Sequence, residues 1–224
     1  MKKILLFITL LTAFVISSCN DETAGVSHIV SYPVVKLKGD AALTILINGA
    51  YTDAGFTATK GTTDLSSSVK VTGAVDPTKA GVYTITYSVT DADGYSASTR
   101  RYVGVITPAA AALDISGTYQ RNAGAYGSAI VKKTSYAGLY TNNNPGGATT
   151  DGTSALAGAT SVTNIVIYMF QTDATVVSAP SQSSTAGEFA CTGGVYNATG
   201  TSPLYKWVCV NSGYGTSVRT FIKQ

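Results

Sequence analysis

The sequence predicts an all-β protein with two antiparallel β domains: a small sandwich, then a meander that forms either a second sandwich or a flattened barrel. Two observations support this prediction. Short apolar segments alternate along the chain with clusters of Gly, Asn, Pro and Asp, which are typical of strands and turns. In addition, the second half contains no segment that sustains the apolar period of about 3.6 residues expected of an amphipathic helix.

Residues 1–18 have the features of a lipoprotein signal peptide. Basic residues precede an apolar run from Ile4 to Ile16, which is shorter than the roughly 20 residues of a spanning helix. Ile16-Ser17-Ser18-Cys19 then fits a lipobox, in which Cys19 receives the lipid. The alternative is an ordinary secretory signal with an incidental cysteine. Lipid on Cys19 would anchor the mature protein to a membrane without spanning it.

The segment after the cysteine indicates where the protein is exported. Asn20-Asp21-Glu22 resembles the acidic surface-export signal of Bacteroidota lipoproteins, and it is also compatible with a simple solvated tether. We therefore expect residues 19–30 to be a lipidated tether and the protein to lie on the outer membrane, exposed at the cell surface. His28 falls in this tether and is expected to be solvated.

Charge and cysteine content limit the partners. Of 15 Lys and Arg residues, Lys2 and Lys3 leave with the leader, so 13 basic residues face 12 acidic ones in the mature chain. With no basic run, nucleic acid is not an expected partner. If Cys19 carries lipid, Cys191 and Cys209 remain as a pair that an oxidising compartment allows to form a disulfide. Two buried free thiols are the alternative, because spacing alone does not give a Cα distance.

The first β domain is expected at residues 31–106. Its clearest strand is Val82–Val89, where tyrosine, isoleucine and valine alternate with threonine and serine. Asp91–Gly94 then forms a turn, and Arg100–Ile106 returns as the partner strand. Asp91–Gly94 also begins like a calcium loop, but the rest of that motif is absent, which favours the turn. Six or seven short strands fit a small sandwich.

The amino-acid sequence of this region resembles a bacterial Ig-like family that is common in surface lipoproteins. The likeness rests on Tyr32–Val35, Gly49–Phe56, Ala80–Asp91 and Arg100–Val103. It implies a spacer or presentation module and supplies no catalytic residues. A frequent Gly-Asn in the last hairpin is replaced here by Gly94-Tyr95, which places an aromatic residue at the loop tip.

Residues 107–112 are expected to link the domains. Pro108 blocks strand continuation, and the alanines that follow it allow a short helical turn and a semi-rigid link. The second β domain is expected at residues 113–224. Ser116–Arg121 and Gly138–Tyr140 resemble the uncharacterised β-rich domain found beside the Ig-like module in Bacteroidota lipoproteins. Related lipoproteins often belong to polysaccharide-utilisation systems, so the resemblance implies the handling of a glycan.

The residues of the second domain do not indicate catalysis. Its four acids lie in no recognisable glycosidase motif, although distant carboxylates can assemble into a pair. It contains no histidine, which excludes a Ser-His-Asp site and a histidine-based metal site there. We therefore expect no enzyme activity, no cofactor and no metal.

Aromatic and amide side chains of the second domain are the candidate ligand-binding groups. Sugar rings have apolar C–H faces that stack on aromatic rings, and amides bond to their hydroxyls. Tyr205 and Trp207 share one strand face with Cys209, so either they form a binding platform or they belong to the core. The glycan-binding candidates are Trp207, Tyr205, Tyr214, Tyr140, Asn142 and Asn143.

The sequence thus predicts a non-catalytic, lipid-anchored outer-membrane surface protein. We expect it to bind or present a polysaccharide or oligosaccharide. The alternative is a structural or adhesion protein, or an accessory subunit that binds another protein in an outer-membrane complex, using a sheet edge or an apolar patch.

Overall fold

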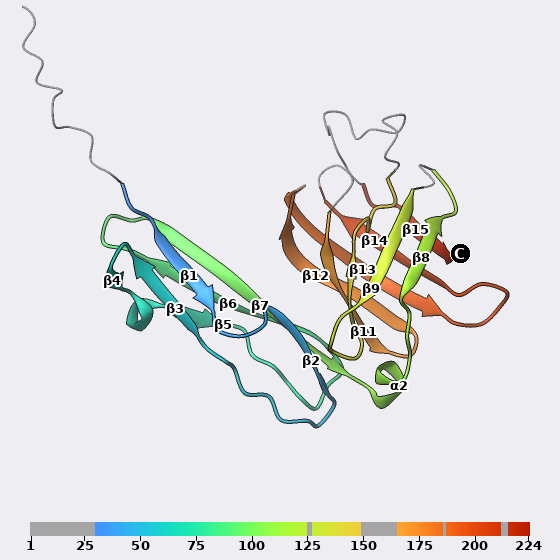
Figure 1. The fold of residues 1–224 in the computed structure, drawn as a ribbon, viewed down its shortest axis with the longest axis horizontal. Coiled ribbons are helices and arrows are strands. Elements are labelled where there is room, and N and C mark those ends of the chain that lie inside the picture. The colour runs from blue at the N-terminus through green and yellow to red at the C-terminus, as the bar shows by residue number, and fades with distance from the viewer. Residues whose placement is uncertain (1–29, 125–126, 149–164, 186, 212–214) are drawn as a thin grey trace, which may run out of the picture. The chain divides into compact units, whose positions relative to one another are not determined.

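The computed structural model describes residues 30–124, 127–148, 165–185, 187–211 and 215–224 of the 224-residue chain (Figure 1). Residues Pro33–Gln224 form one compact unit. Across the described ranges, no helix has both the length and the apolar character needed to cross a membrane. The leader, Cys19 and the predicted tether up to residue 29 lie outside the described residues.

The first module is a β-sandwich, as the sequence predicts. One sheet has the strand order β1-β3-β4 and the other β2-β7-β6-β5. All pairs are antiparallel except β2 with β7, which run parallel from the pair Ala42–Tyr102 to the pair Leu46–Ile106. The elements are β1 (Pro33–Leu37), β2 (Ala42–Leu46), β3 (Phe56–Lys60), β4 (Thr63–Asp64), η1 (Ser66–Ser68), β5 (Lys70–Thr72), β6 (Gly81–Thr90) and β7 (Ser96–Ile106).

Strand β6 has the alternation that the sequence predicts. Ile85 and Tyr87 are buried together with Val103 of β7, and the intervening threonines are only half-buried. The ring of Phe56 packs on Tyr87 with 5.0 Å between centroids. This one-sided burial is the reason that the two sheets associate.

The turn after β6 is also as predicted. Gly94 has φ of 86°, and the Asp91 carboxylate accepts hydrogen bonds from the backbone N–H of Asp93 at 3.0 Å and of Tyr95 at 2.8 Å. The ammonium of Lys60 lies 2.7 Å from Asp91 and also pairs with Asp93. A lysine therefore occupies the place that a cation would need, which agrees with the turn interpretation.

A buried arginine lies in the interior of the sandwich. Arg101 is 1% exposed and pairs with Asp53, whose Oδ1 is 2.6 Å from its Nη1. Hydroxyls of Tyr51 and Tyr87 donate to the other oxygen of Asp53, at 2.7 and 2.5 Å. Burial acts to raise the pKa of Asp53, but the bonds from Tyr87, Arg101 and Tyr51 outweigh it and hold the pKa well below its usual range.

The second half of β7 is buried on both faces. Val103 belongs to the sandwich core, whereas Tyr102 packs with Leu139 and Phe170 from the second half of the chain. At the end of β7 the backbone N–H of Thr107 donates to Thr172 at 3.0 Å. The predicted linker contains the one-turn helix α2 (Pro108–Ala111), capped by the Thr107 side chain.

The second module is a closed eight-stranded antiparallel barrel, which decides between the two predicted arrangements. Around the barrel the order is β10-β11-β12-β13-β14-β15-β8-β9, so the chain forms a meander whose first strand pairs with its last. The strands are β8 (Gly117–Arg121), β9 (Ser128–Lys133), β10 (Leu139–Asn142), β11 (Ile167–Asp173), β12 (Val176–Ser184), β13 (Gly187–Asn197), β14 (Leu204–Val210) and β15 (Val218–Lys223).

Strand β13 contains a glycine pair in its interior. The strand runs through Gly193 and Gly194 with a register shift between Thr192 and Val195. Gly193 has φ of 60°, and a Cβ on Gly194 would lie 2.0 Å from the Val177 carbonyl oxygen. The two glycines therefore form a β-bulge rather than a turn.

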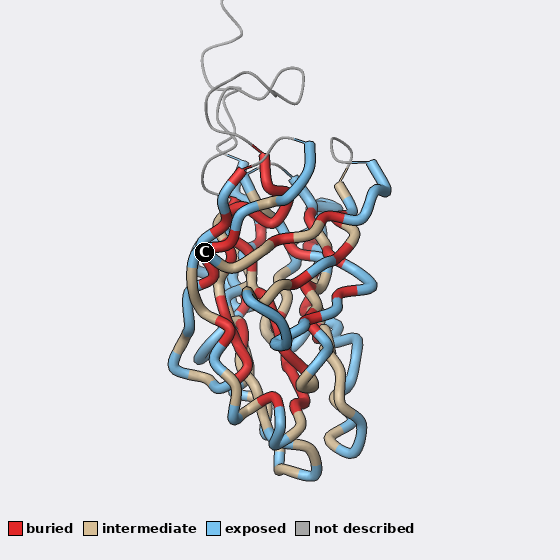
Figure 2. Tube along the Cα trace, turned by 90° about the vertical axis from the view of Figure 1, so that its right-hand side faces the viewer, coloured by how far each residue is buried: buried red, intermediate tan, exposed pale blue. Residues whose placement is uncertain are grey.

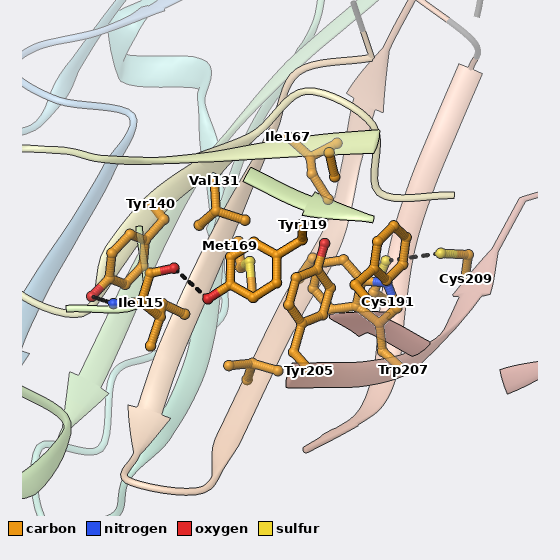
Figure 3. Close-up of a cluster of buried hydrophobic side chains, with 14 of the residues drawn as sticks. Ile115, Tyr119, Val131, Tyr140, Ile167, Met169, Cys191, Tyr205, Trp207 and Cys209 are labelled. Atoms are coloured by element: carbon orange, nitrogen blue, oxygen red, sulfur yellow. Dashed lines mark hydrogen bonds between the residues drawn. The ribbon is translucent and has the colours of Figure 1, made fainter. Parts of the chain in front are cut away.

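The barrel interior is filled by side chains. Buried segments alternate with exposed ones along the strands (Figure 2). Large aromatic residues dominate the core, with Tyr119, Tyr205, Trp207 and Phe221 all fully buried. Figure 3 shows Tyr119, Tyr205 and Trp207 together with the two cysteines among these side chains. A packed interior leaves the outer surface and the strand ends for ligands.

Candidate functional site

Most of the predicted glycan-binding residues are in the barrel core. Trp207, Tyr205, Tyr140 and Asn142 are 0% exposed. A buried ring has no face on which a sugar can stack, so the prediction of a binding platform at these residues is wrong and the core interpretation of Trp207 and Tyr205 holds. Tyr214 lies outside the described residues.

The contacts of these side chains account for their burial. Tyr205 stacks on Phe221 with centroids 4.7 Å apart and planes at 13°, and Trp207 meets Tyr205 edge-on at 4.9 Å. The indole N–H of Trp207 donates to the Pro145 carbonyl at 3.0 Å. The amide of Asn142 donates to the Tyr205 hydroxyl at 3.0 Å. Each buried polar atom named here has a partner, as a barrel core requires.

The two other candidates beside the asparagine loop also have structural partners. The Tyr140 hydroxyl accepts from the backbone of Ile115 at 3.3 Å and donates to the Leu113 carbonyl at 3.1 Å. Asn143 is half-buried, and its side-chain oxygen accepts from the backbone N–H of Ile130 at 2.7 Å. The loop therefore ties strands together rather than presenting amides to a ligand.

The predicted cysteine pair is brought together. Cys191 of β13 and Cys209 of β14 are register partners, and both face the barrel core. Their sulfurs are 3.4 Å apart as free thiols. Burial raises the pKa of the Cys191 thiol well above its usual value, and the neighbouring Cys209 adds to the shift.

A different set of residues forms a surface cleft. It has a volume of about 460 Å³, within the range of roughly 300–1,000 Å³ typical of ligand sites. The cleft lies where the polar end of β7 meets strands β10 to β13 of the barrel. Its lining residues are Ser98, Thr99, Arg100, Tyr102, Thr141, Val166, Ile167, Tyr168, Gln182, Ser183 and Glu188.

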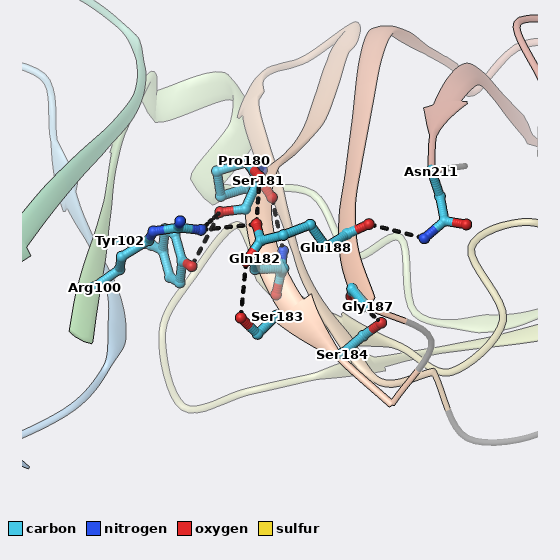
Figure 4. A network of polar contacts seen from close by, with 10 residues as sticks. All are labelled: Arg100, Tyr102, Pro180, Ser181, Gln182, Ser183, Ser184, Gly187, Glu188 and Asn211. Carbon is cyan, nitrogen blue, oxygen red and sulfur yellow. Dashed lines mark hydrogen bonds and ion pairs between the residues drawn. The ribbon is translucent and has the colours of Figure 1, made fainter. Parts of the chain in front are cut away.

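An ion pair joins the two walls of the cleft, β7 and β13. Nη1 of Arg100 is 2.8 Å from Glu188 and also donates to the Ser181 carbonyl at 3.3 Å. The Tyr102 hydroxyl donates to the same carbonyl at 3.1 Å. Figure 4 shows Arg100 and Tyr102 together on one side of this network, directed at Ser181 and Glu188. These bonds fix the positions of both walls.

The Glu188 carboxylate is held in its charged form. Hydroxyls of Ser181 and Ser183 donate to its two oxygens at 2.7 and 2.9 Å. The bond from Ser181, followed by those from Arg100 and Ser183, lowers the pKa of Glu188 to about 2. At neutral pH this group accepts hydrogen bonds and has no proton to give.

Two tyrosines provide the aromatic part of the cleft. The rings of Tyr102 and Tyr168 are 6.3 Å apart at an angle of 50°. Tyr102 is 6% exposed, and burial raises the pKa of its hydroxyl. Tyr168 is half-buried. The side chain of Gln182 bonds to both backbone groups of Tyr168, at 2.7 and 2.9 Å, which fixes the strand that carries this ring.

The sequence did not identify this cleft. Arg100 and Glu188 are 88 positions apart, and no motif links them. One signal was present: residues 102–106 are an unbroken run of apolar residues and glycine, unlike the alternating pattern of β6, and the structure buries this run on both faces. Such a run in a small sandwich indicates that the outer face of the strand has a covering partner.

In the described ranges, no group of three or more metal-ligating side chains is present.

Comparison with known families identifies the first module. Residues 35–105 match the family described as "Bacterial surface protein, Ig-like domain". This part of the chain is therefore an Ig-like domain of the kind found in bacterial surface proteins, which confirms the resemblance inferred from the sequence. No curated protein matches the chain.

Two solved structures are similar to parts of the chain. The crystal structure of the lipoprotein BT2262 from Bacteroides thetaiotaomicron is 18% identical, with a TM-score of 0.38, over 86% of this chain and 100% of that one. The M60 catalytic domain with the CBM51-1 and CBM51-2 domains from Clostridium perfringens ZmpB is 17% identical, with a TM-score of 0.29, over 80% of this chain and 15% of that one.

Proposed function

We propose that this protein is a non-catalytic, lipid-anchored surface protein of the outer membrane that binds a glycan in the cleft beside Tyr168. One observation carries the proposal: a half-buried aromatic ring and a set of fixed polar groups line the same cavity of about 460 Å³. Apolar surface with a few oriented polar groups is the usual composition of a small-ligand site.

The polar groups suit a ligand rich in hydroxyls. Ser98, Thr99, Thr141 and Ser183 contribute hydroxyls to the lining, and Arg100 and Glu188 contribute one positive and one negative charge. Because these charges already pair with each other, the described lining residues offer no unbalanced charge to an ionic ligand. This composition favours a neutral sugar chain, stacked against Tyr168, over an anionic one.

The same residues argue against hydrolysis. Among the described residues that line the cleft, Glu188 is the one carboxylate, whereas glycosidases use two. Its lowered pKa also makes it a poor proton donor at neutral pH. Binding without turnover is therefore the function proposed.

Binding of the purified full-length protein to a panel of neutral polysaccharides tests the proposal, by affinity electrophoresis and calorimetry in detergent. Tyr168→Ala should weaken binding about tenfold, corresponding to about 1.4 kcal/mol, because it removes the stacking ring. Tyr168→Phe retains the ring and should bind like the wild type. Tyr95→Ala, on the loop after β6, is the matched control outside the cleft.

Two results would contradict the proposal. One is a folded wild-type protein that retains no polysaccharide of the panel. The other is Tyr168→Ala binding as tightly as Tyr168→Phe. Thermal melting of each variant shows whether a loss of binding reflects loss of fold.

A groove on the barrel favours a second candidate function, the binding of a protein partner. It has a volume of about 640 Å³ and includes Ala190, Thr192 and Val210 among its lining. Val210 is 52% exposed and contributes apolar surface to this groove. Pull-down from intact membranes with Val210→Asp, against Val34→Asp on β1 as control, tests it. Loss of a stable partner with only the first variant would support this function.

A further inference from the structure

The barrel core contains two thiols in bridging position. In an antiparallel ladder, directly opposed residues have Cα atoms about 4.5 or 5.5 Å apart, and disulfides span about 4.4–6.8 Å. Cys191 and Cys209 are such partners. Their sulfurs are 3.4 Å apart, so rotation about the side-chain bonds suffices to reach the bonding distance of about 2.05 Å.

The surroundings leave the two sulfurs only each other as a reactive partner among the described residues. Cys191 is 1% exposed and Cys209 0%. The Cys209 thiol donates to the Pro145 carbonyl at 3.0 Å, but Trp207 donates to the same oxygen at 3.0 Å. Loss of the thiol proton therefore leaves no buried carbonyl unsatisfied.

We propose that Cys191 and Cys209 form a cross-strand disulfide inside the barrel and that the bond is made before the barrel closes. The inference rests on export of the chain, which the proposed function also requires, because disulfides persist in oxidising compartments. It names a covalent modification site that glycan binding does not depend on.

The chemistry is thiol–disulfide exchange with an oxidising dithiol protein. The thiolate of one cysteine attacks the disulfide of that protein, which forms a mixed disulfide and releases one of its sulfurs as a thiolate. The second cysteine thiolate then attacks the sulfur of the first, forming the Cys191–Cys209 bond and releasing the other sulfur. Two electrons pass to the oxidant, and the two thiol protons end on its reduced dithiol.

The order of events follows from burial. Attack requires a thiolate and access for the oxidant. In the closed barrel both cysteines are buried, which keeps the oxidant out, and burial raises the pKa of the Cys191 thiol, which disfavours its thiolate. Oxidation must therefore occur while β13 and β14 are still accessible. A chain that folds in the reduced state should keep its thiols for a long time, and should take up oxidant only after unfolding.

Mass spectrometry of the full-length protein from membranes tests the bond. The protein is denatured in alkylating reagent, with and without prior reduction, and digested with trypsin. Cleavage after Lys206 separates Cys191 from Cys209, so the two peptides stay together only if a disulfide joins them. We expect linked peptides and no alkylation of either cysteine without reduction. Two alkylated cysteines in the unreduced sample from the same membranes would overturn the proposal.

Variants keep the test independent of peptide recovery. Cys191→Ala/Cys209→Ala should lower the melting temperature of the oxidised protein by about 5–10 °C, since it removes a bridge across residues 192–208. Wild type that is unfolded and refolded in reductant should melt near the double variant. Val195→Ala, on the exposed face of β13, is the control and should melt within about 2 °C of wild type. Equal melting of wild type and double variant would count against a bond.

Failure of this proposal is distinguishable from failure of the proposed function. Linked peptides without polysaccharide binding would retain the disulfide and reject the glycan. Polysaccharide binding with two free thiols would do the reverse.

Discussion

Phe170 of the barrel packs directly against the backbone of Gly104 in the Ig-like module. A Cβ on Gly104 would lie 2.6 Å from Cδ1 of Phe170 and 3.0 Å from Cγ2 of Thr44. Phe170 is fully buried and packs with Tyr102 and Leu139, so a shift of its ring would disturb these neighbours. The close approach of β7 to β11 thus depends on the absence of a side chain at residue 104, and the cleft beside it depends on that approach.

Gly104→Ala should destabilise the protein by about 1–3 kcal/mol, the usual cost of overpacking a filled core. Because the clash lies between β7 and β11, it should also weaken binding at the cleft. Chemical denaturation and polysaccharide titration of the same variant measure the two effects. Gly81→Ala is the control: like Gly104 it has no positive φ, but the nearest atom to a Cβ there, on Tyr83, is 3.9 Å away. An unchanged stability for Gly104→Ala would contradict the packing described.

Trp207 is the single tryptophan of the chain, so fluorescence reports on it alone. Because it is fully buried, its emission should be blue-shifted and resistant to iodide, and saturating polysaccharide should not change it. Trp207→Ala should cost about 3–5 kcal/mol in denaturant unfolding, since it empties the centre of the barrel. A red-shifted, iodide-quenched emission from folded protein would refute the core position.

Acid should weaken the sandwich through Asp53. Its pKa is lowered in the folded state, so its contribution is fully present above the usual pKa of about 3.9 and is lost as the pH falls from there towards the folded value. Asp53→Asn leaves buried Arg101 without a counter-charge, and at pH 7 should cost about 3 kcal/mol. The difference from wild type should shrink below pH 4.

Denaturant unfolding at pH 7, 4 and 3 measures this prediction. Asp93→Asn is the control, because its pair with Lys60 is at the surface and such pairs contribute about 0–1 kcal/mol. A stability gap for Asp53→Asn that stays constant from pH 7 to pH 3 would exclude an electrostatic origin.

Thr107 joins α2 to the barrel through one hydroxyl. Its Oγ1 accepts from the N–H of Ala110 at 3.2 Å and donates to Asp173 at 2.8 Å. Thr107→Ala should cost about 1 kcal/mol, the typical value for a lost N-cap. Thr107→Ser retains the hydroxyl and should fall within about 0.5 kcal/mol of wild type. Equal losses for both variants would assign the effect to the methyl group.

Local patterns predicted the strands well. The alternation in β6 and the turn at Gly94 depend on neighbouring residues, so they can be read from a short window. The bulge at Gly193-Gly194 could not be predicted in this way, because a glycine pair signals either a turn or a close approach. What decides between them is the position of Val177 on another strand.

Which face of a strand points to the core was harder to predict. The sequence placed Tyr205, Trp207 and Cys209 on one side of a strand correctly, since side chains alternate. Period alone does not say whether that side faces core or solvent, and here the barrel interior takes it. The cleft could not be predicted from the sequence for a related reason. Arg100 and Glu188 meet only after both modules have folded.

The sharing of β7 between two modules restricts how this chain can change over evolution. Tyr102, Gly104 and Ile106 alternate with Arg101, Val103 and Val105, and all six are buried. Substitutions on one side can accumulate without disturbing the other. An insertion or deletion of one residue would exchange the two sides at once, placing the arginine against the barrel and a tyrosine in the sandwich. We therefore expect length variation among descendants of this sequence to spare this strand and to collect in the loops.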